Sequence, residues 1–210
     1  MSRSFSGDLV IDQYQQANLK GAIIRRKIMR LLKLNWGKPV ALGVLMASLL
    51  TSCSSVDVSD YRDTNPPLVL ESFFNGPLKA SGIVENFSGK VIRRFNVTME
   101  ASWQGTEGTI KEWFVYDDGE TQTRIWRIQS QGKGQYTGTA DDIIGTAQGE
   151  ASGSALRWRY DMLLPVDGDE YQVHFDDWMY LVNDNTIINQ SDIIKWGITV
   201  AKVTLVIQKR

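Results

Sequence analysis

Apolar and polar residues alternate along most of the chain after residue 90, with the period of a half-buried β-strand. From Val91 to Trp103 the odd positions are mostly apolar and the even positions mostly polar. Ser154–Leu164 and Tyr171–Leu181 repeat this alternation, and Ile198–Ile207 is rich in β-branched residues, which favour strands. Before these runs, Leu68–Phe74 is compatible with one short helix. The pattern therefore predicts an all-β domain after a single helical turn.

Short sequences typical of hairpin turns separate the strand-like runs. They are Asp117–Glu120, Gly132–Gly134, Pro165–Asp169 and Asn183–Asn185. The glycine- and alanine-rich segment Gly145–Gly153 predicts weak or bulged strands. Nine or ten strands with short links predict an antiparallel up-and-down meander that closes into a barrel, because closure removes exposed strand edges. A two-sheet sandwich without a cavity remains the alternative.

The charges divide the chain into a basic front and an acidic remainder. Residues 1–52 hold eight Lys or Arg and two acidic residues, which leaves 15 basic and 22 acidic residues for 53–210. An acidic domain repels polyanions, so we expect no nucleic-acid partner.

The front of the chain has the order of a secretory signal, with basic residues before a short apolar run. Val40–Leu50 carries no charge and is too short to span a bilayer, which takes roughly 20 residues. Leu50–Cys53 resembles a bacterial lipobox, which implies acylation of Cys53 and cleavage before it. Ser54, where an Asp would favour inner-membrane retention, implies an outer-membrane anchor facing the periplasm. A buried core thiol is the alternative for Cys53, and Met29 is an alternative start.

These features predict that the chain is divided into three segments. Residues 1–52 are a leader and lipoprotein signal peptide, and 53–67 are the lipidated cysteine with a flexible tether, because this segment is polar and ends in two prolines. Residues 68–210 are the barrel domain, which is long enough to bury one core.

Two charged residues fall on apolar strand faces, where a charge must be paired, solvated or facing a ligand. Asp177 shares the face of Phe175 and Met179, and Arg93 lies between Val91 and Phe95. Both could form the polar end of an apolar pocket that holds the head group of an amphiphile. A buried Arg–Asp bridge, or a bulge that turns Asp177 outward, is the other interpretation. The remaining candidate ligand-binding residues are Trp103, Trp158, Tyr160, Phe175 and Met179.

Four segments resemble a family of uncharacterised bacterial lipoproteins known as domain of unknown function 3833. They are Tyr136–Asp142, Gly145–Gly149, Leu156–Tyr160 and Asp176–Tyr180, and the resemblance extends from Phe73 to Lys209. It implies the lipoprotein address and a lipocalin-like barrel, and it brings no known activity.

Few residues suited to catalysis or metal binding are present. One cysteine and one histidine exclude an internal disulfide and a two-histidine zinc site, so we predict no metal and no cofactor. His174 lies on a polar strand face, so we assign no catalytic residues. We expect a non-enzymatic protein that binds or carries a hydrophobic or amphiphilic small molecule. The alternatives are a lipoprotein that docks on an envelope complex and, third, a lipid-modifying enzyme that uses a carboxylate such as Asp177.

Overall fold

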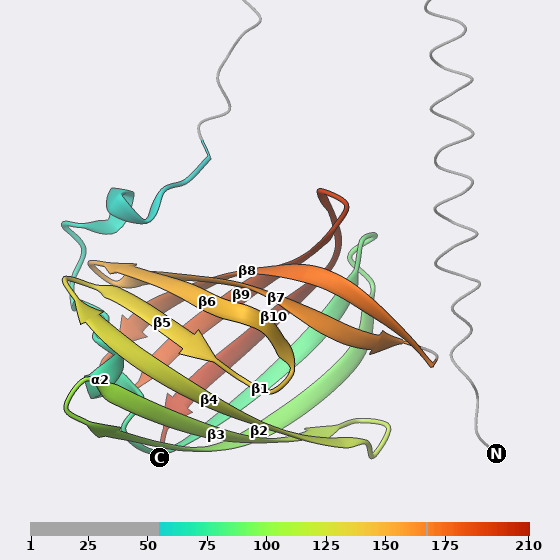
Figure 1. The fold of residues 1–210 in the computed structure, drawn as a ribbon, viewed down its shortest axis with the longest axis horizontal. Helices are drawn as coiled ribbons and strands as arrows, with labels where there is room; N and C mark the ends of the chain where they lie inside the picture. The colour runs from blue at the N-terminus through green and yellow to red at the C-terminus, as the bar shows by residue number, and fades with distance from the viewer. Residues whose placement is uncertain (1–54, 167) are drawn as a thin grey trace, which may run out of the picture. The chain divides into compact units, whose positions relative to one another are not determined.

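The alternating segments form ten antiparallel strands that close into one barrel (Figure 1). The computed structural model describes residues 55–166 and 168–210. The strands are β1 (Gly76–Asn86), β2 (Val91–Gln104), β3 (Glu107–Tyr116), β4 (Thr121–Gly132), β5 (Gln135–Thr139), β6 (Ile143–Ser152), β7 (Ala155–Val166), β8 (Asp169–Asn183), β9 (Thr186–Lys195) and β10 (Ile198–Lys209). Each strand neighbours the next in sequence, and β10 pairs with β1. The predicted antiparallel meander that closes into a barrel is confirmed, and the sandwich alternative is wrong.

Every second residue of a strand faces the inside of the barrel, as the alternation predicts. Leu78 and Ile187 are fully buried there, and Met99 is 3% exposed. These residues belong to one hydrophobic core that draws on all ten strands and on the helix before β1. The core therefore includes both halves of the barrel, with Leu78 and Ile207 next to this helix and Met162 and Val173 away from it.

The helix α2 (Leu70–Phe73) covers one end of the barrel. Trp103 Nε1 donates a hydrogen bond to the carbonyl of Phe74 at 2.9 Å, and Lys209 Nζ donates to the carbonyl of Ser72 at 2.8 Å. Both donors stand at strand ends, so they fix the helix across that end. The predicted short helix is confirmed, and it is shorter at both ends than the segment Leu68–Phe74.

The hairpin turns β1–β2, β3–β4 and β9–β10 lie at the other end of the barrel (Figure 1). Of the two helices in the described residues, α2 lies at the opposite end, and the 3₁₀-helix η1 (Val58–Tyr61) packs against β8. Neither helix covers these turns, so we call this the open end.

Residues 57–67 differ from the flexible tether that their polar composition predicts. The side chain of Asp57 caps η1, Val58 is 2% exposed, and the Tyr61 ring lies 5.6 Å from that of Tyr180 on β8. Gly153 lets this segment approach closely, because a Cβ there would lie 1.7 Å from the carbonyl oxygen of Tyr61. Two apolar side chains and a capped turn thus order a segment of polar composition, and the folded unit begins before residue 68.

The glycine-rich strand β6 is bulged, as predicted, with a register shift between Ile144 and Gln148. Its glycine content also has a packing role. A Cβ at Gly149 would lie 2.2 Å from the Trp158 ring, and one at Gly138 on β5 would lie 2.6 Å from it. The two glycines leave the space that this inward tryptophan occupies.

The leader 1–52 and the lipidation motif at Cys53 lie outside the described residues, so both stay predictions. Within the described ranges, neither helix is long and apolar enough to cross a membrane.

Candidate ligand-binding site inside the barrel

A buried carboxyl group marks the centre of the site. Asp177 faces inward from β8 and is 7% exposed, and its Oδ1 has no hydrogen-bond partner. Ser191 stands directly across from it on β9 and is also buried. An unpartnered buried acceptor costs free energy, because water no longer solvates it. Such an atom inside a barrel is therefore suited to a partner that arrives from outside.

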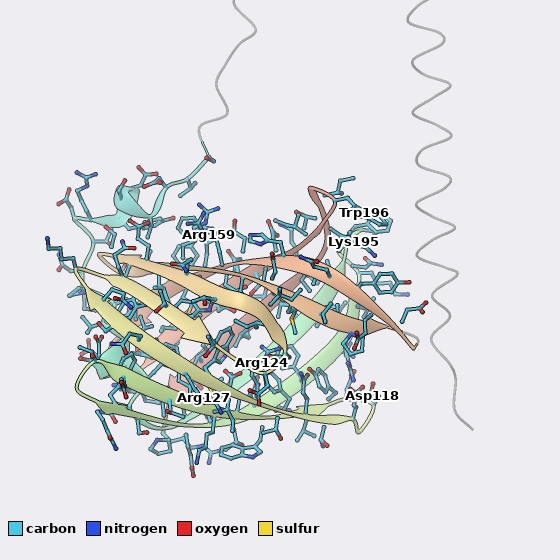
Figure 2. The ribbon with its side chains drawn as sticks, in the orientation of Figure 1. Asp118, Arg124, Arg127, Arg159, Lys195 and Trp196 are labelled. Carbon is cyan, nitrogen blue, oxygen red and sulfur yellow. The ribbon has the colours of Figure 1, made fainter. Side chains whose placement is uncertain are left out.

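Four more polar side chains surround the same space. Glu112 on β3 is the cross-strand neighbour of Arg124 on β4. Arg124 holds Asp142, which precedes β6, with Nη2–Oδ2 and Nε–Oδ2 distances of 2.7 and 2.8 Å. Tyr160 comes from β7, and its phenol interacts with the charges of Asp177 and Arg124. We call Glu112, Arg124, Asp142, Tyr160 and Asp177 the interior cluster, and Figure 2 shows Arg124 midway along the barrel.

Burial changes the protonation of two cluster carboxyls. It raises the pKa of Glu112 to about 7, although the neighbouring Arg124 charge acts to lower it. Burial likewise raises the pKa of Asp177 to about 7 against the opposing effect of the Ser191 hydroxyl. Desolvation favours the neutral acid in both cases. Near neutral pH both carboxyls are therefore poised to gain or lose a proton.

The aromatic and cationic members keep their protons. Burial and the Asp177 charge raise the pKa of Tyr160 well above its ordinary value, so its phenol remains a hydrogen-bond donor. The Tyr160 ring stacks on Phe175 with centroids 5.0 Å apart and meets Trp126 edge-on at 5.3 Å. Packing on two sides thus fixes the direction of the phenol.

Apolar side chains around the cluster face inward yet are only half-buried. They are Phe114, Met179, Val203 and Leu205. A side chain on the inner face of a closed barrel can retain accessible surface only where it borders open space. The inner face of the barrel therefore keeps some accessible apolar surface at these four positions.

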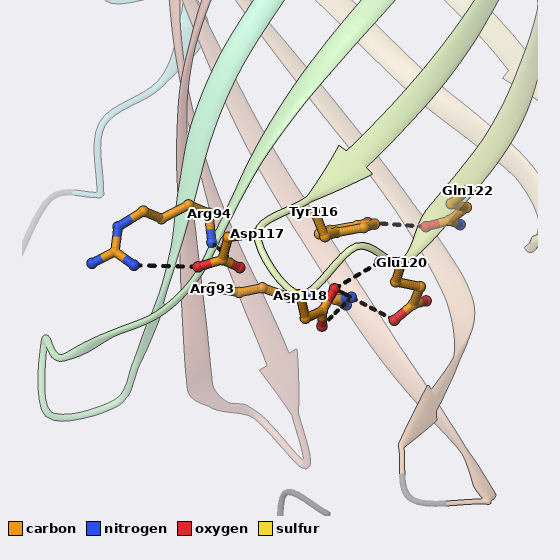
Figure 3. Close-up of polar contacts among 7 residues, drawn as sticks. All are labelled: Arg93, Arg94, Tyr116, Asp117, Asp118, Glu120 and Gln122. Carbon is orange, nitrogen blue, oxygen red and sulfur yellow. Dashed lines mark hydrogen bonds and ion pairs between the residues drawn. The ribbon is translucent and has the colours of Figure 1, made fainter. Parts of the chain in front are cut away.

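Charged residues at the β3–β4 turn hold Arg93 at the open end (Figure 3). Its Nη2 lies 3.0 Å from Asp118 Oδ2 and also contacts Glu120 Oε2. Its guanidinium lies over the Tyr116 ring, 3.6 Å from the centroid. Two carboxylates therefore occupy Arg93, and the predicted alternative of a bridge with Asp177 is not formed.

The sequence-predicted residues fall into four places. Asp177, Tyr160, Phe175 and Met179 come together at the interior cluster. Trp103 binds the covering helix, and Trp158 fills the space beside two glycines. Arg93 stands at the open end. Their role in ligand binding stays a prediction.

Glu112, Arg124 and Asp142 were missed from the sequence. The alternation carried a signal for two of them. Glu112 lies midway between inward Ile110 and Phe114, and Arg124 lies two positions before inward Trp126, so both share an inward face. Asp142 lies in a turn, where alternation gives no direction.

Other chemistry has little support in the described part of the chain. No group of three or more His, Cys, Asp or Glu side chains there is placed to hold a metal ion. His174 is 41% exposed, and its Nδ1 lies 2.8 Å from Asp161 Oδ1. This histidine faces away from the interior cluster.

Comparisons with known proteins give a family and no activity. Residues 47–209 match the family described as Protein of unknown function (DUF3833). No curated protein matches the chain. The S-type phycobiliprotein lyase CPES from Guillardia theta is 7% identical with a TM-score of 0.48, covering 68% of this chain and 94% of that chain. The odorant binding protein OBP1 is 19% identical with a TM-score of 0.32, covering 70% and 77% respectively.

Proposed function

Because this chain belongs to the DUF3833 family, whose function is unknown, we propose its function from the barrel itself. The protein binds one amphiphilic small molecule inside the barrel and carries it at the cell envelope. The polar end of the molecule meets the interior cluster, and its apolar part lies against Phe114, Met179 and Leu205.

The unpartnered Oδ1 of Asp177 carries this proposal. A buried carboxyl at this position destabilises the empty barrel, whereas an apolar residue would complete the core. Apolar side chains with free inner surface adjoin it. A few convergent polar groups inside an apolar enclosure are the usual composition of a small-molecule site.

The cellular location of the protein is a second part of the proposal. Acylation of Cys53 anchors the protein to the periplasmic face of the outer membrane, since several acyl chains give stable attachment. The lipobox-like sequence Leu50–Cys53 supports this step and lies within the matched residues 47–209.

A pair of tryptophan substitutions tests binding inside the barrel. Leu205→Trp places a large ring in the interior space, whereas Val206→Trp places the same ring on the outer face, where Val206 is 38% exposed. We expect the apolar dye N-phenyl-1-naphthylamine to bind wild type and Val206→Trp, and to lose most of its fluorescence with Leu205→Trp. Equal dye binding by both variants, or none by wild type, would contradict an interior site.

A second function, acid–base catalysis, is favoured by one observation. The pKa values of Glu112 and Asp177 near 7 suit groups that transfer protons at neutral pH. The two functions differ in what happens to the bound molecule. A carrier returns its ligand with unchanged mass after long incubation, whereas an enzyme returns a product that disappears in Asp177→Asn.

A further inference from the structure

We propose that the polar end of the bound molecule is a cationic hydrogen-bond donor, of which a protonated primary amine is the simplest. This inference rests on the proposed function and names the chemical class of its ligand. The charges, the hydrogen bonds and the proton equilibria of the interior cluster support it separately.

The cluster contains three carboxyl groups and one guanidinium. Arg124 is its only cation, and its hydrogen bond and its ion pair both go to Asp142. Arg93, which also comes from an inner face, is paired with Asp118 and Glu120 at the open end. Glu112 and Asp177 therefore lack a cation of their own. A positive ligand supplies that charge, whereas a carboxylate ligand would meet like charges in a space with little water.

Hydrogen bonding points the same way. The buried atoms of the cluster without a partner are acceptors, Asp177 Oδ1 and Asp142 Oδ1. Asn189 donates to the carbonyl of Trp178 and Ser191 to Asn189 Oδ1, each at 3.3 Å, while the Ser191 and Tyr160 hydroxyls also act on the Asp177 carboxyl. None of these donors meets Asp177 Oδ1. The site thus offers acceptors to a donor, and an ammonium group has three N–H donors and no acceptor.

The protonation of Asp177 and Glu112 gives independent support for a cationic ligand. Asp177 faces Tyr160 from β7, Ser191 from β9 and Arg124 from β4, with Asp176 beside it on its own strand. Glu112 faces Arg124 and Asp142. The raised pKa of each carboxyl means that the empty site holds protons near pH 7. A cation favours the ionised carboxyls, so its binding releases protons and tightens as pH rises through about 7.

Three probes of one chain length test the ligand class on the purified full-length chain. They are octylamine, octanoate and octanol, and isothermal titration calorimetry measures their affinities at pH 5.5 and 8. We expect octylamine to bind at least about tenfold more tightly than octanoate at pH 8, because charge-assisted hydrogen bonds are the stronger ones. We also expect octylamine to lose about tenfold at pH 5.5, where octanol is unchanged.

Substitutions assign the effect to the cluster. Asp177→Asn and Glu112→Gln should each weaken octylamine about tenfold and leave octanol unchanged, which also shows that the barrel is folded. The matched control is Asp161→Asn, which neutralises a carboxyl that faces outward beside His174. It should change neither affinity.

The outcomes separate the two proposals. Octanoate binding as tightly as octylamine, or octylamine binding unaffected by Asp177→Asn and Glu112→Gln, overturns the cationic ligand and leaves the carrier function standing. A failure of all three probes, together with loss of dye binding in wild type, overturns both.

Discussion

At the scale of single residues, the buried carboxyls that we assign to ligand binding lower the stability of the empty protein. Glu112 and Asp177 are acids that burial keeps from ionising freely. An apolar side chain at either position would pack into the barrel without that penalty. We therefore expect the two carboxyls to destabilise the empty protein at neutral pH and to be compensated only by a ligand.

Asp177→Asn should flatten the dependence of stability on pH. In wild type the folded pKa is about 7 and the ordinary value is 3.8, so the unfolded chain releases this proton first. Stability therefore falls from about pH 4 to pH 7, by up to about 4 kcal/mol, since one pKa unit equals about 1.4 kcal/mol. Asparagine has no such proton, so the variant loses this contribution and keeps the one from Glu112, whose pKa burial also raises to about 7.

Urea unfolding at pH 4.5, 6 and 8 measures the difference. Asp161→Asn is the control, because that carboxyl is 43% exposed. The same decline in wild type and in Asp177→Asn would contradict the assigned burial.

Cys53→Ser should leave an unprocessed precursor that takes up no labelled fatty acid, because the thioether forms on sulfur. Ser54→Ala keeps the cysteine and should be processed and labelled normally. The readouts are gel mobility and radiolabelled palmitate, and a mature, labelled Cys53→Ser product would rule out the lipidation motif.

The inward direction of Asp177 followed from the alternation between Phe175 and Met179. The partner of Arg93 did not follow from it, because a strand period gives the face of a residue and not the reach of a long side chain. Asp118 and Glu120 come from a turn whose path alternation does not describe.

At the scale of elements, η1 shows how few contacts order a polar segment. The backbone of Tyr61 passes directly over Gly153 in the β6–β7 turn, and Leu68 N donates to the Gly153 carbonyl at 2.7 Å. Composition predicted a tether at this point because acidic and polar residues outnumber apolar ones. The apolar residues of η1 that pack, Val58 and Tyr61, are too few to form a pattern, and Thr64 adds hydrogen bonds to Ser154 that composition does not reveal.

Gly153→Ala should release this segment. Its φ of 52° disfavours alanine, and the added Cβ would meet the Tyr61 carbonyl oxygen. Gly105→Ala is the matched control, with a φ of 62° and open space around the added Cβ. The conformational cost of about 1 kcal/mol is common to both.

We therefore expect Gly153→Ala alone to make residues 56–67 susceptible to limited proteolysis, and to lose more stability than Gly105→Ala. Equal protease patterns in the two variants would show that η1 does not depend on this contact.

At the scale of the whole molecule, the barrel has two unlike ends. Trp103 and Lys209 hold α2 across one end, and the other carries hairpin turns, with Asp118, Lys195 and Trp196 at that end in Figure 2. Periodicity and turn chemistry predicted the meander and its closure, since every strand neighbours the next in sequence. They did not predict how far side chains fill the interior, because that depends on long-range packing such as Trp158 against Gly138 and Gly149.

Native mass spectrometry of the purified chain, after incubation with a total lipid extract of the envelope, tests most directly whether the barrel holds a ligand. We predict one bound small molecule per chain in wild type and in Val206→Trp, lost on denaturation and absent from Leu205→Trp. An unmodified protein mass in wild type, or the same adduct on Leu205→Trp, would contradict a ligand held inside the barrel.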